Sequence, residues 1–161
     1  MEVDGASVIL GLDPGRDKVG WALTTEKGEL LLSGIVPVSD LGGFWPLLKE
    51  RHLDEKALRP WILERPGRVR GERMGSVLLG NGTQARFFAE SLTKWGLAFS
   101  MVDERGTTLE ARSLYWRLHR PPWWQKLLPQ TLWVPPRPVD DLAAWAIVLR
   151  AVSGEGPQMK I

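Results

Sequence analysis

A change of hydrophobic period near residue 40 constrains the fold of this chain more than any other feature. Before it, three short apolar runs (7–12, 20–25 and 30–36) follow one another, with a tight Lys27-Gly28 turn before the third. Runs of this kind are typical of antiparallel β-strands. After it, apolar residues recur at helical spacing between further short strand-like runs. The sequence therefore predicts an α/β protein with one mixed sheet.

The later elements follow in alternation. Helices are expected over 44–53, 83–95, 107–120 and 140–152, and strands over 76–79 and 97–102. The first helix tolerates Pro46 only in its first turn. Thr83 is expected to cap the second helix and Gly96 to end it, and Thr107 with Glu110 fits a capping box at the third. This is the layout of the ribonuclease H-like fold: three antiparallel strands, then two parallel strands, with helices on both faces.

Two segments interrupt the pattern. Residues 54–75 crowd five arginines around one apolar patch, Trp61 to Leu63, and are expected to form an irregular basic insertion. Residues 121–138 hold half of the 12 prolines and three of the 9 tryptophans, which predicts a long extended connection. A chain of 161 residues is long enough for one domain with a real core, so residues 1–161 are expected to form a single domain.

Composition excludes several classes of site. The chain has no cysteine and only two histidines, His52 and His119, so disulfide frameworks, thiolate zinc sites and histidine-based triads have almost nothing to be built from. Carboxylates must carry any hydrolytic chemistry. The first residues are acidic where a secretory signal would be basic, and the apolar runs are too short to cross a bilayer, so a cytoplasmic protein is expected.

Basic residues are concentrated in the middle of the chain. Residues 59–130 carry 12 basic against 6 acidic side chains, whereas residues 1–58 carry 6 against 10. A basic block favours a polyanionic partner such as nucleic acid, although a solvated basic face without a partner has the same composition.

Three acidic residues stand at the ends of predicted elements. Asp13 follows the first strand in Asp13-Pro14-Gly15, Glu104 follows the strand that ends at Val102, and Asp140 begins the last helix. Each is commonplace alone, as a turn or a helix cap. Together they can converge on one edge of the sheet, where they would repel one another unless divalent cations neutralised them.

The motifs that carry these acids resemble those of the YqgF family of RuvC-like nucleases. The resemblance covers nearly the whole chain and is carried by the following segments: Leu12-Asp13-Pro14-Gly15, Val19-Gly20-Trp21-Ala22, Val102-Asp103-Glu104-Arg105-Gly106-Thr107-Thr108, Ala111-Arg112, Val139-Asp140 and Ala143-Ala144. The sequence departs from the family pattern in two places. Gly80-Asn81-Gly82-Thr83 stands where many members have Gly-Leu-Pro, and Gly106 stands where leucine is usual.

The resemblance implies a ribonuclease H-like fold and hydrolysis of phosphodiester bonds with two Mg²⁺ or Mn²⁺ ions. Members of that family are described as Holliday-junction resolvases or as nucleases that mature pre-16S ribosomal RNA. The family's acidic positions fall on Asp13, Glu104 and Asp140. Lys18 and Arg105 are candidates to meet the phosphate charge, and equally ordinary surface cations.

Several alternatives stay open at this point. Residues 61–65 can themselves be the fourth strand, which would place Glu64 at a strand end and in the metal site. Asp141 follows Asp140 on the last helix but points about 100° away from it, so it is the weaker candidate. Arg68 and Arg70 are candidates for phosphate contact, and Trp123 and Trp124 either stack on bases or pack on the protein's own core. A protein that keeps the fold and binds nucleic acid without cleaving it is the main rival function. A phosphate loop of the sugar-kinase type needs more chain than is present. The sequence does not decide between DNA and RNA, or between a monomer and a homodimer.

Overall fold

A seven-stranded mixed sheet forms the centre of the molecule in the computed structural model, which describes residues 7–154 and the backbone of residues 158–160. The strands lie in the order β4-β3-β2-β1-β5-β6-β7. Their bounds are β1 (Ser7–Pro14), β2 (Lys18–Thr24), β3 (Leu30–Pro37), β4 (Ile62–Glu64), β5 (Arg73–Gly80), β6 (Ser100–Val102) and β7 (Gln158–Lys160). Strands β1 to β3 are antiparallel neighbours, and β5 and β6 run parallel to β1. The predicted ribonuclease H-like fold class is therefore confirmed by the strand topology.

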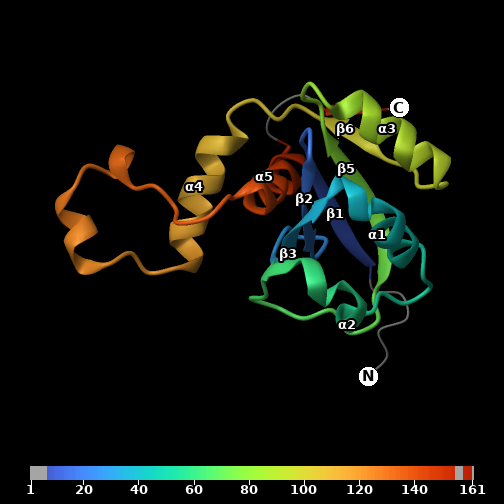
Figure 1. Ribbon diagram of the computed structural model, residues 1–161, viewed down its shortest axis with the longest axis horizontal. Helices are drawn as coiled ribbons and strands as arrows, with labels where there is room; N and C mark the ends of the chain where they lie inside the picture. The colour runs from blue at the N-terminus through green and yellow to red at the C-terminus, as the bar shows by residue number, and fades with distance from the viewer. Residues whose placement is uncertain (1–6, 155–157, 161) are drawn as a thin grey trace.

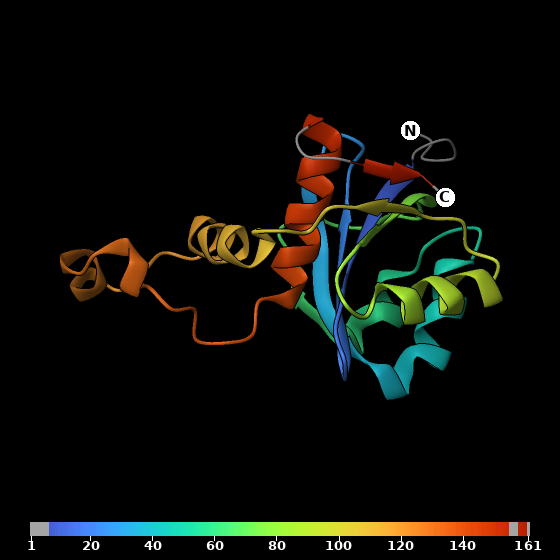
Figure 2. The same ribbon diagram turned by 90° about the horizontal axis from the view of Figure 1, so that it is seen from above.

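Helices cover both faces of this sheet (Figures 1 and 2). Their bounds are α1 (Leu41–Leu48), α2 (Glu55–Leu58), α3 (Ala85–Lys94), α4 (Thr107–Leu118) and α5 (Asp140–Ser153). Helices α1 and α3 pack on one face around Trp21, Phe44 and Phe88, which are fully buried. On the other face α5 lies on β1, β2 and β3, and α4 packs against α5. None of the helices in the described residues is long and apolar enough to cross a membrane.

The two outermost strands are additions to the predicted sheet: β4 corresponds to the strand that residues 61–65 offered only as an alternative, and β7 was not predicted. Strands β4 and β7 have three residues each and pair antiparallel with β3 and β6. A three-residue strand is too short to show a hydrophobic period, so only its tertiary pairing reveals it. Strand β4, together with α2, gives the expected irregular insertion at 54–75 more regular structure than its sequence predicts.

Helix α1 begins three residues earlier than predicted. Leu41, Phe44, Trp45 and Leu48 are its buried residues, at the spacing of one helical face. Pro46 consequently lies inside the helix and not in its first turn. Pro46 cannot donate the backbone hydrogen bond of its position, and the helix ends two residues later, where the Lys49 N–H donates to the Pro46 carbonyl.

The predicted helix caps are wrong at two starts. Helix α3 begins after Gln84, with no side-chain cap from Thr83, although Gly96 ends it as expected with φ +74°. Helix α4 follows Gly106, whose φ of +79° suits glycine. Thr107 is thus inside the helix, and its hydroxyl donates to the Glu104 carbonyl at 2.8 Å. Glycine replaces the leucine that is usual in the family at position 106 because the backbone there is left-handed, a conformation that glycine adopts without strain.

Helix α5 lies unusually close to the sheet at two glycines. A Cβ at Gly11 would be 2.4 Å from the Ala144 carbonyl oxygen, and one at Gly20 would be 2.1 Å from that of Asp140. Neither position has room for a side chain. Because Gly20 is the cross-strand partner of Asp13, this contact brings the start of α5 beside the end of β1.

Residues 121–138 form an arm that projects from the body between α4 and α5 (Figures 1 and 2). The arm contains two short 3-10 helices, η3 (Trp123–Leu127) and η4 (Gln130–Leu132), and no longer element. It agrees with the extended connection that its prolines predict.

Candidate active site

Asp13 stands near the end of β1, at the edge of the sheet. Its backbone pairs with Gly20 of β2, and Pro14 pairs with Val19, so the ladder continues past the acid. On the other side the pairing of β1 with β5 ends at Leu12, the residue before the acid. A residue held by one ladder at the end of a central strand has little freedom to move, which suits an acid that must keep a fixed position.

Glu104 follows β6 and is held by the turn after β5. Its backbone N–H donates to the Asn81 side-chain oxygen at 3.2 Å. Its carboxyl group lies against Gly80 and Gly82, and a Cβ at Gly82 would be 2.1 Å from the Glu104 Oε1 atom. The Gly80-Asn81-Gly82 sequence therefore has a local purpose, because its amide orients the acid and its glycines leave room for the carboxyl group.

A residue that sequence reasoning missed supports the same loop. Arg150 of α5 donates to the Asp103 carbonyl at 2.9 Å and to the Glu110 carboxylate of α4. It ties the last helix and α4 to the loop that carries Glu104. No local pattern marks this role, since the partners are 40 and 47 residues away.

Asp140 is the first residue of α5 and pairs with Lys18 of β2, with the Lys18 Nζ 3.2 Å from the carboxylate. Both side chains are partly exposed. Lys18, one of the predicted phosphate contacts, is thus beside the predicted metal ligands.

The three acids interact electrostatically. Burial, followed by a hydrogen bond and charge repulsion from Glu104 and by the charge of Asp140, raises the pKa of Asp13 from 3.8 to about 9. Asp13 therefore carries a proton at neutral pH when no cation is present. The Glu104 Oε1 atom is buried and has no hydrogen-bond partner among the described residues.

The residues fit a hard divalent cation. They offer carboxylate oxygens, which Mg²⁺ and Mn²⁺ prefer. One of these oxygens, Glu104 Oε1, is buried without a hydrogen-bond partner among the described residues, and one acid, Asp13, is kept protonated by burial and by its neighbouring carboxylates. Across residues 7–154 no three potential ligands already stand in a metal-holding arrangement. Asp140 is paired with Lys18 instead, so this pair has to open for all three acids to serve one site.

Glu64 and Asp141 belong to a different cluster, here called the arm clamp, with His119 and Arg137. Glu64 Oε2 accepts from His119 Nε2 at 2.7 Å and from Arg137 Nη2 at 2.6 Å. Asp141 accepts from Arg137 Nη1 at 2.8 Å and from the Ser33 hydroxyl at 2.6 Å. His119 and Arg137 flank the arm, so these acids anchor both of its ends and do not join Asp13.

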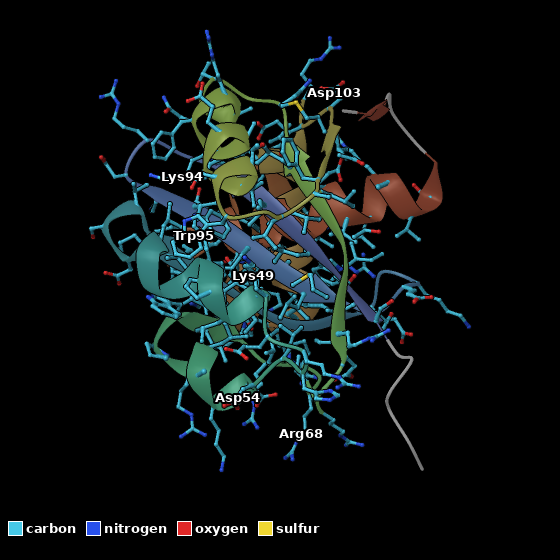
Figure 3. The ribbon with its side chains drawn as sticks, turned by 90° about the vertical axis from the view of Figure 1, so that its right-hand side faces the viewer. Lys49, Asp54, Arg68, Lys94, Trp95 and Asp103 are labelled. Carbon is cyan, nitrogen blue, oxygen red and sulfur yellow. The ribbon has the colours of Figure 1, made fainter. Side chains whose placement is uncertain are left out.

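The other predicted nucleic-acid contacts are dispersed. Arg105 is exposed and pairs with Asp103 at 3.4 Å. Arg68 and Arg70 are exposed, and Figure 3 shows Arg68 and Asp103 at opposite ends of the molecule. The structure therefore does not bring Arg68 and Arg70 near Asp13, Glu104 and Asp140.

Trp123 and Trp124 lie on the arm with 78% and 51% of their surface exposed. The alternative that they pack on the core is therefore wrong. By contrast, Trp145 of α5 is buried and its indole N–H donates to the Gly28 carbonyl, and Trp95 is partly buried.

Comparison with known proteins gives similarity of architecture only. No protein-family model and no curated protein matches the sequence. A solved structure of T. thermophilus RuvC in complex with a Holliday junction substrate has a TM-score of 0.46 and 14% identity, and the match covers 95% of this chain and 99% of that chain. A further Thermus thermophilus RuvC structure has a TM-score of 0.44 and 15% identity, covering 94% and 99%.

Proposed function

We propose that this protein is a metal-dependent endonuclease that hydrolyses phosphodiester bonds in structured nucleic acid. The observation that carries the proposal is the convergence of Asp13, Glu104 and Asp140 from β1, the loop after β6 and the start of α5. A site in which burial and neighbouring carboxylates raise the pKa of Asp13 is suited to divalent cations.

Asp13, which interacts electrostatically with both other acids, would hold the cations together with Glu104 and Asp140. Mg²⁺ or Mn²⁺, when bound, supplies an activated water and a counter-charge for the leaving oxygen. Lys18, released from Asp140, is in reach of a phosphate at the same edge. The glycines at 80 and 82 keep the Glu104 carboxylate in place.

The motif resemblance supports a narrower proposal, in which the chain is a YqgF-type nuclease acting on pre-16S ribosomal RNA or on branched DNA. Precursor ribosomal RNA combines duplex arms with unpaired regions, and branched DNA joins duplex arms at a junction. The exposed tryptophans and the absence of any Asp or Glu from residues 111–139 suit contact with such a substrate.

The test is incubation with labelled four-way DNA junctions and with precursor ribosomal RNA, each with Mg²⁺, with Mn²⁺ and with a chelator. We expect metal-dependent cleavage of at least one substrate and its loss in Asp13→Asn. Asp17→Asn is the matched control, because Asp17 is an exposed acid near the same turn. Tight binding of both substrates without cleavage in either metal would favour the rival function of a non-catalytic nucleic-acid-binding protein.

A further inference from the structure

A pocket of about 490 Å³ lies where the arm folds back on α4, away from the acids just described. Its walls are Arg112, Trp116 and Arg117 from α4 and Gln130, Thr131 and Trp133 from the arm. The volume falls in the range of small-molecule sites, about 300–1,000 Å³. We propose that this pocket binds one unpaired nucleobase together with its phosphate. The proposal goes beyond endonuclease activity, because it assigns a second, non-catalytic site.

The aromatic walls are held in fixed orientations. The Trp133 indole N–H donates to the Leu128 carbonyl at 3.1 Å, which fixes that ring within the arm. Trp116 meets Trp133 edge to face, with centroids 6.1 Å apart, and meets Tyr115 at 4.9 Å. Rings fixed in this way need little reordering when a base stacks on them.

The charges at the pocket favour a phosphate. Arg112 is exposed, and neither Arg112 nor Arg117 makes an ion pair within the described part of the chain; the Arg117 guanidinium lies over the Trp145 ring, 5.9 Å from its centroid. Residues 111–139 include five Lys and Arg side chains and no acid, and the acid that precedes them, Glu110, is paired with Arg150. Free guanidinium groups beside fixed rings are the chemistry that recognises a nucleotide.

The polar residues of the pocket suit the edge of a base. Gln130 offers an amide that both donates and accepts, and Thr131 offers a hydroxyl. Helix α4 runs from the loop that carries Glu104 to this pocket, and Thr107 and Arg112 are about 7.5 Å apart along its axis at 1.5 Å per residue. One nucleic-acid strand can therefore follow α4 from the acids to the pocket.

The experiment is fluorescence anisotropy with a labelled single-stranded hexanucleotide, in chelator, with all six bases intact or with one base removed. Working without metal keeps the result independent of cleavage, so failure of the nuclease proposal and failure of this one are distinguishable. Trp133→Ala should weaken binding of the intact strand by at least about 5-fold and that of the abasic strand by less than about 2-fold. Trp133→Phe should retain most of the affinity.

Arg112→Gln should weaken binding of both strands and lower the salt slope by about one. Arg86→Gln, an exposed arginine on the opposite face of the sheet, is its control. A nucleoside monophosphate competitor that displaces the strand would show that the pocket also takes free nucleotides. The proposal is overturned if Trp133→Ala binds the intact strand with the parent's affinity. It is also overturned if the affinity of Trp133→Ala falls by the same factor for the intact and the abasic strand. Should Trp133→Ala fail to fold, the unchanged affinity of Arg112→Gln would overturn it equally.

Discussion

Asp13 is the residue whose chemistry depends most on its surroundings. Its raised pKa comes first from burial and then from two neighbouring carboxylates. The same acid in a solvated turn would be ionised at neutral pH. Binding a cation must therefore displace its proton.

The first prediction concerns metal binding by Asp13→Asn. Without metal the variant should be as stable as the parent or more so, because it lacks the carboxylate repulsion, but it should lose the rise in Tm that Mn²⁺ gives the parent. Thermal unfolding with and without Mn²⁺ measures this, with Asp17→Asn as control. An undiminished Mn²⁺ shift in Asp13→Asn would remove Asp13 from the metal site.

The second prediction concerns pH. The folded protein holds a proton on Asp13 up to a pKa of about 9, whereas the unfolded chain releases it near 3.8. The folded state therefore binds more protons in this window, and the free energy of unfolding of the metal-free protein should fall as pH rises from about 4 towards 9. Denaturant titrations across this range should show a shallower dependence in Asp13→Asn. Equal slopes in the two proteins would contradict the raised pKa.

The third prediction concerns Gly82. In Gly82→Ala the new methyl group would overlap the Glu104 carboxyl group, which has to move. A displacement of about 1 Å at a catalytic group costs on the order of 100-fold in rate, so cleavage should fall by about that factor. Gly42→Ala is the control, because nothing lies within 4 Å of its added Cβ. Cleavage at the parent rate in Gly82→Ala would show that the space left by Gly82 is not needed to position the Glu104 carboxyl group.

At the level of elements, the two clusters of acids are separate: one is the proposed metal site, and the other, the arm clamp, anchors the arm. The loop after β6 presents Glu104 to Asp13, whereas β4 presents Glu64 to His119 and Arg137 on either side of the arm.

The fourth prediction separates these two glutamates. Glu104→Gln should reduce cleavage by at least about 100-fold, the usual scale for an essential group. Glu64→Gln should leave cleavage within a few-fold and lower the free energy of unfolding by about 1–3 kcal/mol, because the Arg137 guanidinium and the His119 ring lose their charged hydrogen-bond partner. Single-turnover cleavage and denaturant unfolding measure the two effects. The reverse ranking would mean that the arm clamp is the catalytic centre.

The sequence predicts the position of a site residue well where that residue stands at the end of a strand or at the start of a helix. Asp13, Glu104 and Asp140 were predicted from strand and helix ends, and the structure places them as neighbours for that reason. The arm clamp was not predicted, since Glu64 meets partners 55 and 73 residues away and no local pattern encodes such a contact. The caps at Thr83 and Thr107 were predicted wrongly, because glycine and backbone turns can begin a helix without a side-chain cap.

Across the whole molecule, the exposed arginines of the 54–75 insertion and the exposed tryptophans of the arm occupy different regions. Arg68 lies at the end opposite Asp103 (Figure 3), and Trp123 belongs to η3 of the arm, which projects from the body (Figure 1). A substrate that contacts both has to extend along much of the protein, or else the arginines bind phosphates independently of the site.

The fifth prediction uses salt to separate these regions. Replacing both Arg68 and Arg70 with Ala should lower the slope of log affinity against log salt by up to about two, because each phosphate contact releases counterions. Trp123→Ala should weaken binding to single-stranded regions by about 1–3 kcal/mol and leave the slope unchanged. Its Tm should match the parent's, since the side chain is 78% exposed. A fall in Tm of several degrees with intact affinity would contradict the stacking role.

The position of α5 also sets when the proposed site is complete during synthesis. Helix α5 brings Asp140 to Asp13 only by seating against Gly11 and Gly20, which leave the ribosome long before it does. At roughly 5–20 residues per second, the roughly 130 residues between the two acids take on the order of 6–25 s to translate. A nascent chain that has already formed β1, β2 and β3 therefore still lacks one of its three acids. Nearby RNA, including that of the ribosome making it, is exposed to an assembled centre only after the last helix has emerged.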